Sequence, residues 1–297
     1  MAQKLRETCK WIENRPEFQK WMTTDRSMIL LVSGKHGCGK SVLAKYVREH
    51  VRRHAKTKTT DTNILASFFN NRRRDTNQVA TEMIRSLLYQ ILICSPSLID
   101  SIPLVEYSTE LKQNGKEEVE WQLDCLETLF LALRSAEGNF TFYLIIDAVD
   151  EAQFGEPIIT KLVNSLVSED SFCKFKILLT ARNSSNKVKN SLASQKSIIL
   201  DVSEDISNEI NNHVTTQLSL LRECYSREGY PDKYLNEHLD PMIDRHSNQS
   251  KGSFLWVNQE LIRLKEEQSS GTSVVDLVRE SGIDEIERRT EFWNLGG

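Results

Sequence analysis

Residues 34–41 read Gly34-Lys35-His36-Gly37-Cys38-Gly39-Lys40-Ser41 and fit the pattern G-x-x-x-x-G-K-[ST] without deviation. The apolar run MILLVS precedes this segment at 28–33, and the run VLAKYVREH follows it at 42–50. The first run predicts a buried strand and the second a helix, so the segment is a loop between the two. Glycines let such a loop wrap around phosphates with its N–H groups turned inward, and the helix adds its positive N-terminal end. The segment therefore predicts a nucleoside triphosphate site, and a glycine-rich turn without a ligand is the alternative.

Two side chains of this loop carry the expected chemistry. Lys40 is expected to bring a mobile positive charge to the β- and γ-phosphates, and the Ser41 hydroxyl is expected to ligate Mg²⁺. His36 and Cys38 occupy free positions of the pattern, and we expect both to be spectators rather than sites of oxidation. The predicted nucleotide-binding residues are Gly34, Lys35, His36, Gly37, Cys38, Gly39, Lys40, Ser41 and Val42.

Four further apolar runs alternate with helical patterns along the next part of the chain. Continuous rather than alternating apolarity predicts strands that are buried on both faces, as in a parallel sheet covered by helices. The alternation predicts right-handed crossovers and an open α/β sheet. The strand candidates are NILASFF (63–69), TFYLIID (141–147), FKILLT (175–180) and SIILDV (197–202), and the helix candidates are 41–54, 78–93, 119–135 and 157–167.

Acidic residues follow the strand predicted at 141–147. Because Asp147 ends this run, we expect its carboxylate at the carboxyl edge of the sheet, beside the loop after the first strand, where it can hold Mg²⁺. Asp150 and Glu151 are expected to orient or deprotonate the attacking water, and a solvated acidic turn is the alternative. Arg182 follows the next strand and is expected to approach the γ-phosphate as a sensor, with a surface arginine as the alternative.

The composition is that of a globular chain of 297 residues with a formal net charge of −4. This charge gives no reason to expect a nucleic acid or a membrane as partner. The six cysteines are scattered and form no CxxC pair, so we expect reduced thiols rather than zinc or disulfides. The first residues lack a signal-peptide pattern, and no apolar run reaches the ~18–20 residues of a membrane span. A cytoplasmic protein is expected.

The strand pattern ends near residue 203, and helical spacing follows at 204–221, 234–245 and 254–267, with shorter candidates at 274–280 and 283–289. The predicted domains are an N-terminal helical flank (1–27), a P-loop NTPase core (28–203) and a helical subdomain (204–297). The flank contains Trp11, Phe18 and Trp21 at roughly helical spacing, and we expect them to pack on the core or to cover the base of the nucleotide. The chain has two clusters of basic residues. The first cluster is interpreted as a solvated helix end, and it consists of Arg48, Arg52, Arg53, Lys56 and Lys58. The second is the run Arg72–Arg74, interpreted as a solvated loop, and a phosphate- or partner-binding patch is the alternative for both.

An ordered set of segments resembles the NACHT family of P-loop NTPases of the STAND class, and within it the fungal NACHT domains. The set begins upstream of the phosphate loop and extends over most of the chain. It consists of TCKWIENRPEFQKW (8–21), the phosphate loop, ILASFFNNRR (64–73), MIRSLLYQIL (83–92), IIDAVDEA (145–152), ILLTAR (177–182) and GSFLWVNQELIRL (252–264).

The resemblance implies a five-stranded parallel P-loop NTPase sheet flanked by helices, with a small C-terminal helical subdomain. It implies a slow ATPase or GTPase that acts as a switch, in which ADP or GDP is the resting ligand and exchange to the triphosphate permits self-association. In the NACHT pattern the catalytic positions fall on Lys40, Asp150, Glu151 and Arg182, and the Mg²⁺ positions on Ser41 and Asp147.

The chain also departs from the NACHT pattern. No winged-helix domain, repeat array or effector domain accompanies the core, so we expect a piece of a longer receptor-like protein in innate-immunity or incompatibility-type signalling. Many NACHT proteins also have a G-x-P turn in the helical domain that touches the nucleotide. At the corresponding place this chain has Gly252-Ser253-Phe254, without the proline. Two other functions remain as alternatives. One is a small-molecule kinase or phosphotransferase, which would share the loop and the Asp, and the other is an interaction module that binds nucleotide for stability alone.

Overall fold

The computed structural model describes residues 9–55, 62–69, 79–103, 122–152, 155–168, 172–192 and 196–271. The chain divides into two compact units. The first comprises 1–36 and 40–202, and the second comprises 37–39 and 203–297. The central residues of the phosphate loop therefore group with the C-terminal helices, and the rest of the loop groups with the sheet.

The first unit is built on a five-stranded sheet in the order β2-β3-β4-β1-β5, and each of its strand pairs is parallel. This confirms the predicted five-stranded parallel sheet. Every residue of β1 and of β3 is buried, as their continuous apolar runs predict. The strands are β1 (Met28–Gly34), β2 (Thr62–Phe69), β3 (Phe140–Asp147), β4 (Lys174–Arg182) and β5 (Ser197–Asp201).

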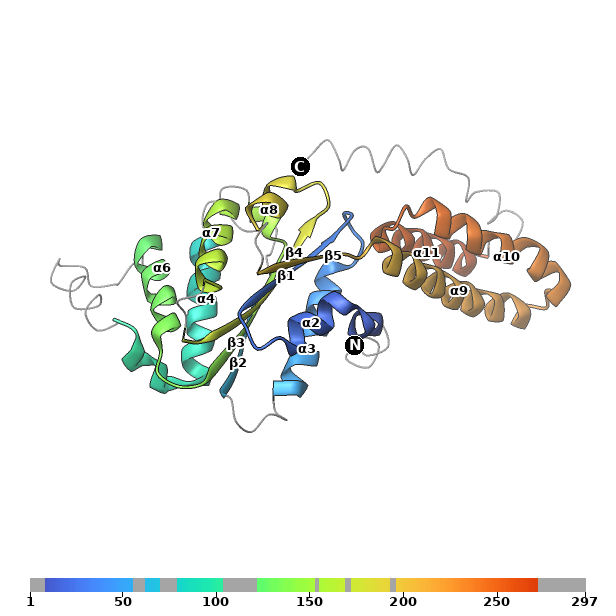
Figure 1. The fold of residues 1–297 in the computed structure, drawn as a ribbon. Coiled ribbons are helices and arrows are strands. Elements are labelled where there is room, and N and C mark those ends of the chain that lie inside the picture. The colour runs from blue at the N-terminus through green and yellow to red at the C-terminus, as the bar shows by residue number, and fades with distance from the viewer. Residues whose placement is uncertain are drawn as a thin grey trace, which may run out of the picture. The chain divides into compact units, whose positions relative to one another are not determined.

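Helices cover both faces of this sheet, so that α2 and α3 lie on one face and α4, α6 and α7 on the other (Figure 1). The helix predicted at 119–135 begins outside the described residues and is divided between α6 and the 3-10 turn η4. The helix α8 was not predicted, because its sequence NKVKNS is short and polar. The helices are α2 (Pro16–Thr23), α3 (Lys40–Ala55), α4 (Val79–Cys94), α6 (Leu123–Ala132), α7 (Glu156–Leu166) and α8 (Asn186–Ser191), and the 3-10 turns are η1 (Lys10–Asn14), η3 (Pro96–Ser101), η4 (Leu133–Ser135) and η5 (Val149–Ala152).

The N-terminal flank packs on the sheet, which is one of the two roles expected for its aromatic residues. Phe18 and Trp21 of α2 are 2% and 0% exposed. The Trp21 indole Nε1 donates a hydrogen bond to the backbone oxygen of Met28 in β1 at 3.2 Å. After α2, Asp25 forms an ion pair with Lys174 of β4 at 2.6 Å. These contacts make the flank part of the first unit.

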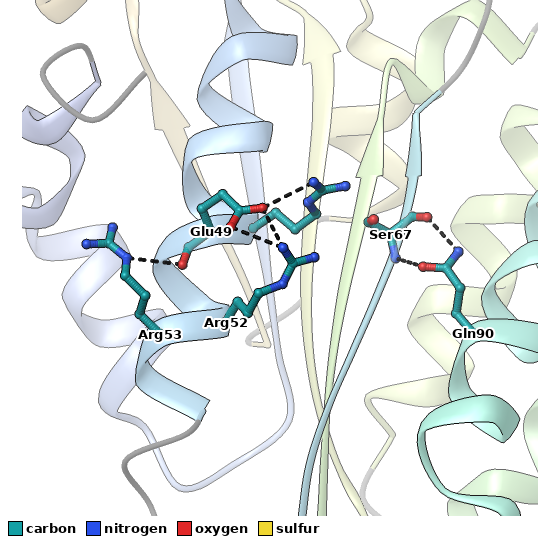
Figure 2. A network of polar contacts seen from close by, with 6 residues as sticks. Glu49, Arg52, Arg53, Ser67 and Gln90 are labelled. Atoms are coloured by element: carbon teal, nitrogen blue, oxygen red, sulfur yellow. Dashed lines mark hydrogen bonds and ion pairs between the residues drawn. The ribbon is translucent and has the colours of Figure 1, made fainter. Parts of the chain in front are cut away.

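Strand β2 ends the sheet on one side, and a glutamine of α4 hydrogen-bonds its exposed backbone. The Gln90 side chain accepts a hydrogen bond from the Ser67 N–H at 3.0 Å and donates one to the Ser67 carbonyl at 2.9 Å (Figure 2). The amide therefore hydrogen-bonds the Ser67 N–H and carbonyl as a neighbouring strand would do.

The arginines at the basic end of α3 contact one residue of the same helix, Glu49 (Figure 2). Glu49 lies 3.1 Å from Arg48 and 2.9 Å from Arg52, and the Arg53 Nε donates to the Glu49 carbonyl at 3.3 Å. These contacts favour the solvated helix end over a phosphate-binding patch. Lys56, Lys58 and the run Arg72–Arg74 lie outside the described residues.

The second unit contains the three predicted helices α9 (Ser203–Arg227), α10 (Asp232–Gln249) and α11 (Phe254–Ser269). Apolar residues at helical spacing bury one side of α9, and Arg222 lies 3.8 Å from both Asp232 and Asp240 of α10. The shorter helices predicted at 274–280 and 283–289 lie outside the described residues. Over the described ranges, none of the helices is both long and apolar enough to cross a bilayer.

Candidate functional site

The phosphate loop lies between β1 and α3, as its flanking patterns predict. Gly37 and Gly39 have φ angles of +70° and +93°, which L-residues with a Cβ rarely adopt. Gly34 is the last residue of β1 and is buried. Lys40 opens α3, and Ser41 lies exposed in its first turn. The pattern therefore uses two of its glycines for backbone conformation and ends at a helix N-terminus, where an anion is stabilised.

The side chains of the loop differ in how they are placed. The Lys40 Nζ donates hydrogen bonds to the carbonyls of Gly34 at 2.9 Å and Lys35 at 2.8 Å, which holds the cation against the loop. Cys38 is 2% exposed, whereas Val42 is 42% exposed. His36 is exposed. Burial of the Cys38 thiol suits the predicted spectator, because a thiol out of solvent reacts poorly.

Strand order determines how far Asp147 lies from the phosphate loop. Asp147 is the last residue of β3, and β4 lies between β3 and the strand β1 that leads into the loop. The tip of β3 is therefore two strand spacings, or roughly 10 Å, from the tip of β1. Asp147 itself is 4% exposed and accepts a hydrogen bond at Oδ1 from the Thr180 hydroxyl of β4 at 2.5 Å. The intervening strand thus supplies the side chain that holds Asp147.

The acidic residues after β3 meet Arg182 at the end of β4. Asp150 and Glu151 belong to the 3-10 turn η5. The Arg182 guanidinium lies 3.0 Å from Glu151 Oε1 and 3.4 Å from Asp150 Oδ2. The structure therefore brings these three predicted residues together as one ion-paired group. In this arrangement Arg182 contacts the acids that were expected to act on water.

The environment of Asp150 changes its acidity. Burial raises the pKa of the Asp150 carboxyl above its ordinary value of 3.8, although the charge of Arg182 opposes the change. A carboxylate with a raised pKa is a stronger proton acceptor, because the proton it takes is held more tightly. Within the turn, the Asp150 carboxyl therefore holds a proton more tightly than an ordinary aspartate does.

Sequence reasoning missed a polar network at the same edge of the sheet. The Ser33 hydroxyl of β1 donates to the Asn183 side chain, whose Nδ2 donates to Asp201 of β5 at 3.3 Å. The Asn183 N–H donates to the carbonyl of Gly34 at 3.1 Å. Thr180 was also missed, although a hydroxyl that ends an apolar run signals a buried polar group. Asn183 carries no such signal, because its partners come from strands distant in sequence.

The donor set suits Mg²⁺, a hard cation that prefers oxygen and is usually held by one or two protein ligands, phosphates and water. The two side chains predicted to hold Mg²⁺, the Ser41 hydroxyl and the Asp147 carboxylate, would each supply such an oxygen. Over the described part of the chain, no group of three or more His, Cys, Asp or Glu side chains is arranged to hold a metal. A site that depends on nucleotide phosphates does not require such a group.

Comparison with known proteins gives a family and a relative. Residues 7–182 match the family described as Nephrocystin 3, N-terminal. Vegetative incompatibility protein HET-E-1 of Podospora anserina is 25% identical over 179 residues. This alignment covers 60% of the chain and 12% of HET-E-1, so the chain spans about an eighth of that relative.

Solved structures resemble the fold at low identity. Drosophila ORC bound to DNA has a TM-score of 0.52 at 13% identity, and the match covers 94% of this chain and 59% of that chain. A mutant form of Thermotoga maritima RuvB has a TM-score of 0.47 at 14% identity, covering 96% and 74%. Of these two, only the Drosophila structure has a TM-score above 0.5, and at 13% identity its similarity concerns the fold alone.

Proposed function

The chain belongs to the Nephrocystin 3, N-terminal family and is a NACHT-like P-loop NTPase, and on this premise we propose that it binds ATP or GTP with Mg²⁺ and hydrolyses it slowly. The proposal rests on one observation above the others. A loop with two left-handed glycines and a basic side chain leads into a helix N-terminus, and an acidic group ion-paired to Arg182 lies at the same edge of the same sheet.

The residues divide the chemistry among them. The loop N–H groups and Lys40 would hold the phosphates, and Ser41 and Asp147 would hold Mg²⁺, which stabilises the charge that develops on the transferred phosphoryl group. Asp150 or Glu151 would orient the water and accept its proton, and Arg182 would contact the γ-phosphate. Because Arg182 is ion-paired with both acids, its approach to a phosphate would also release them for the water.

We further propose that the bound nucleotide is the signal. ADP or GDP would be the resting ligand, and exchange to the triphosphate would permit self-association. The printed name of the relative HET-E-1 is that of an incompatibility protein, which supports a role in receptor-like signalling of the incompatibility or innate-immunity type. The chain spans only a small part of that relative, so the sensing and effector parts are proposed to lie in other domains.

Nucleotide binding and phosphate release by the purified chain test the proposal. Lys40→Ala should abolish binding, because it removes the charge that faces the phosphates. Glu151→Gln should keep binding, lose phosphate release and accumulate the triphosphate form with a larger mass by light scattering. Undiminished binding by Lys40→Ala would contradict the assignment of the loop. Phosphate transfer to a metabolite, instead of release to water, would favour the phosphotransferase.

A further inference from the structure

Thr180 is the residue of this edge to which no role has been given, and it is nearly completely enclosed. It lies in β4 two residues before Arg182 and is 1% exposed. Side chains two residues apart in a strand point to the same face, so Thr180 and Arg182 share a face of the sheet. The hydroxyl makes two hydrogen bonds, one at 2.5 Å to Asp147 and one at 2.8 Å to the backbone of Ala148.

The directions of these two bonds are fixed by chemistry. An ionised carboxylate can only accept, so the single hydroxyl hydrogen of Thr180 is donated to Asp147 Oδ1. The Ala148 N–H can only donate, so it binds a lone pair of the same oxygen. The first bond has a charged acceptor and is of the stronger kind. Within the described residues, Asp147 Oδ2 makes no hydrogen bond, which leaves it for another ligand.

The second bond, from the Ala148 N–H, connects Thr180 to the start of the acidic turn η5. Ala148 has a φ of +55°, a left-handed conformation that is unfavourable for a residue with a Cβ. Its N–H is held by Thr180, and its carbonyl accepts a hydrogen bond from the Glu151 N–H at 3.1 Å. One hydroxyl therefore connects the last residue of β3 to the turn that carries Asp150 and Glu151.

We propose that Thr180 is a positioning residue, whose hydroxyl orients the Asp147 carboxylate for Mg²⁺ and fixes the start of the acidic turn. This inference rests on the proposed function, because it assumes that Asp147 meets a nucleotide-bound metal ion. Thr180 acts through Asp147 and Ala148 and contacts no phosphate itself. Removal of a side chain that orients a metal ligand commonly costs 10–100-fold in metal affinity.

The test compares Thr180→Val, which has the same shape without the hydroxyl, with Thr180→Ser, which keeps it. A fluorescent ATP or GTP analogue reports binding in EDTA and during a Mg²⁺ titration. We expect Thr180→Val to bind like wild type in EDTA, but to need about 10–100-fold more Mg²⁺ for the half-maximal effect. Thr180→Ser should stay near wild type. An unchanged Mg²⁺ requirement in Thr180→Val would overturn the inference.

Two further comparisons separate a failure of the role of Thr180 from a failure of the proposed function and from misfolding of the variant. If wild type binds no nucleotide, or Mg²⁺ does not affect its binding, the proposed function fails and the role of Thr180, which rests on it, fails with it. If Thr180→Val does not fold, as judged by thermal melting, Thr180→Cys replaces it, because a buried thiol is tolerated and is only a weak donor. This variant should need more Mg²⁺ than Thr180→Ser, and equal requirements would overturn the inference.

Discussion

At the scale of single residues, unusual backbone conformations lie close to the predicted chemistry. Gly37 and Gly39 have positive φ angles in the phosphate loop, and Ala148 has one directly after Asp147. Glycine adopts this region without strain, whereas alanine does so at a cost of roughly 1–2 kcal/mol. The strain at Ala148 is therefore maintained by its surroundings, which include the hydrogen bond from its N–H to Thr180.

Ala148→Gly should relieve this strain. Glycine also raises the entropy of the unfolded chain, at a cost of about 0.5–1 kcal/mol, so the expected net change runs from about zero to a gain of about 1.5 kcal/mol in unfolding free energy. Urea unfolding measures it. Ala66→Gly in β2 is the control, because this buried residue has no positive φ, and it should lose at least about 0.5 kcal/mol. Equal losses in both variants would mean that Ala148 is not strained.

At the scale of elements, η1 and α3 are joined by a cluster of titratable groups. The Tyr46 hydroxyl and the His50 Nδ1 both contact Glu13 Oε1, the latter at 3.0 Å. Burial lowers the pKa of His50 below its ordinary value of 6.5, and the charge of His54 adds to the change, although Glu13 opposes it. Burial alone would raise the pKa of Glu13, but the hydrogen bond from Tyr46 and the charge of His50 outweigh it, so this pKa lies below 4.5.

The His50 shift predicts a loss of stability in mild acid. Below pH 6.5 the unfolded chain binds a proton at His50 more readily than the folded chain, so the unfolding free energy falls as pH decreases. Glu13 adds a similar loss only below 4.5. His50→Gln should therefore flatten the pH dependence of the urea midpoint between pH 6.5 and pH 4.5, below which Glu13 also contributes. Gln217→Asn on α9, which changes no titratable group, is the control and should keep the wild-type slope. A retained slope in His50→Gln would refute the assignment.

The same scale shows what the sequence could predict. Each strand was located to within a few residues, because runs such as TFYLIID are buried on both faces and leave a continuous apolar signal. The order of the strands has no local signal, so the position of β4 between β3 and β1 could not be derived from the apolar runs. The side-chain contacts of Asp147 with Thr180 and of Arg182 with Glu151 were missed, because these pairs join residues that lie about thirty positions apart.

At the scale of the whole chain, the buried apolar residues form separate groups. One continuous cluster runs from Ile29 to Leu192 and includes Leu144 of β3. The buried face of α9, which includes Leu218, is not part of that cluster. Each compact unit therefore has apolar side chains of its own to bury, which is what a unit needs to unfold cooperatively by itself.

Truncation of one core should consequently affect one unit. Leu144→Ala and Leu218→Ala each remove a side chain that is at most 2% exposed, with an expected loss of about 2–5 kcal/mol in the unfolding free energy of the affected unit. Native-state hydrogen exchange measures the stability of each unit separately. Leu144→Ala should speed amide exchange in β1, β3 and β4, and Leu218→Ala should speed it in α9, α10 and α11. A nucleotide with Mg²⁺ should slow exchange in the sheet of wild type through binding to the folded state. If either truncation speeds exchange equally in both sets of amides, the chain unfolds as one unit and the division is wrong.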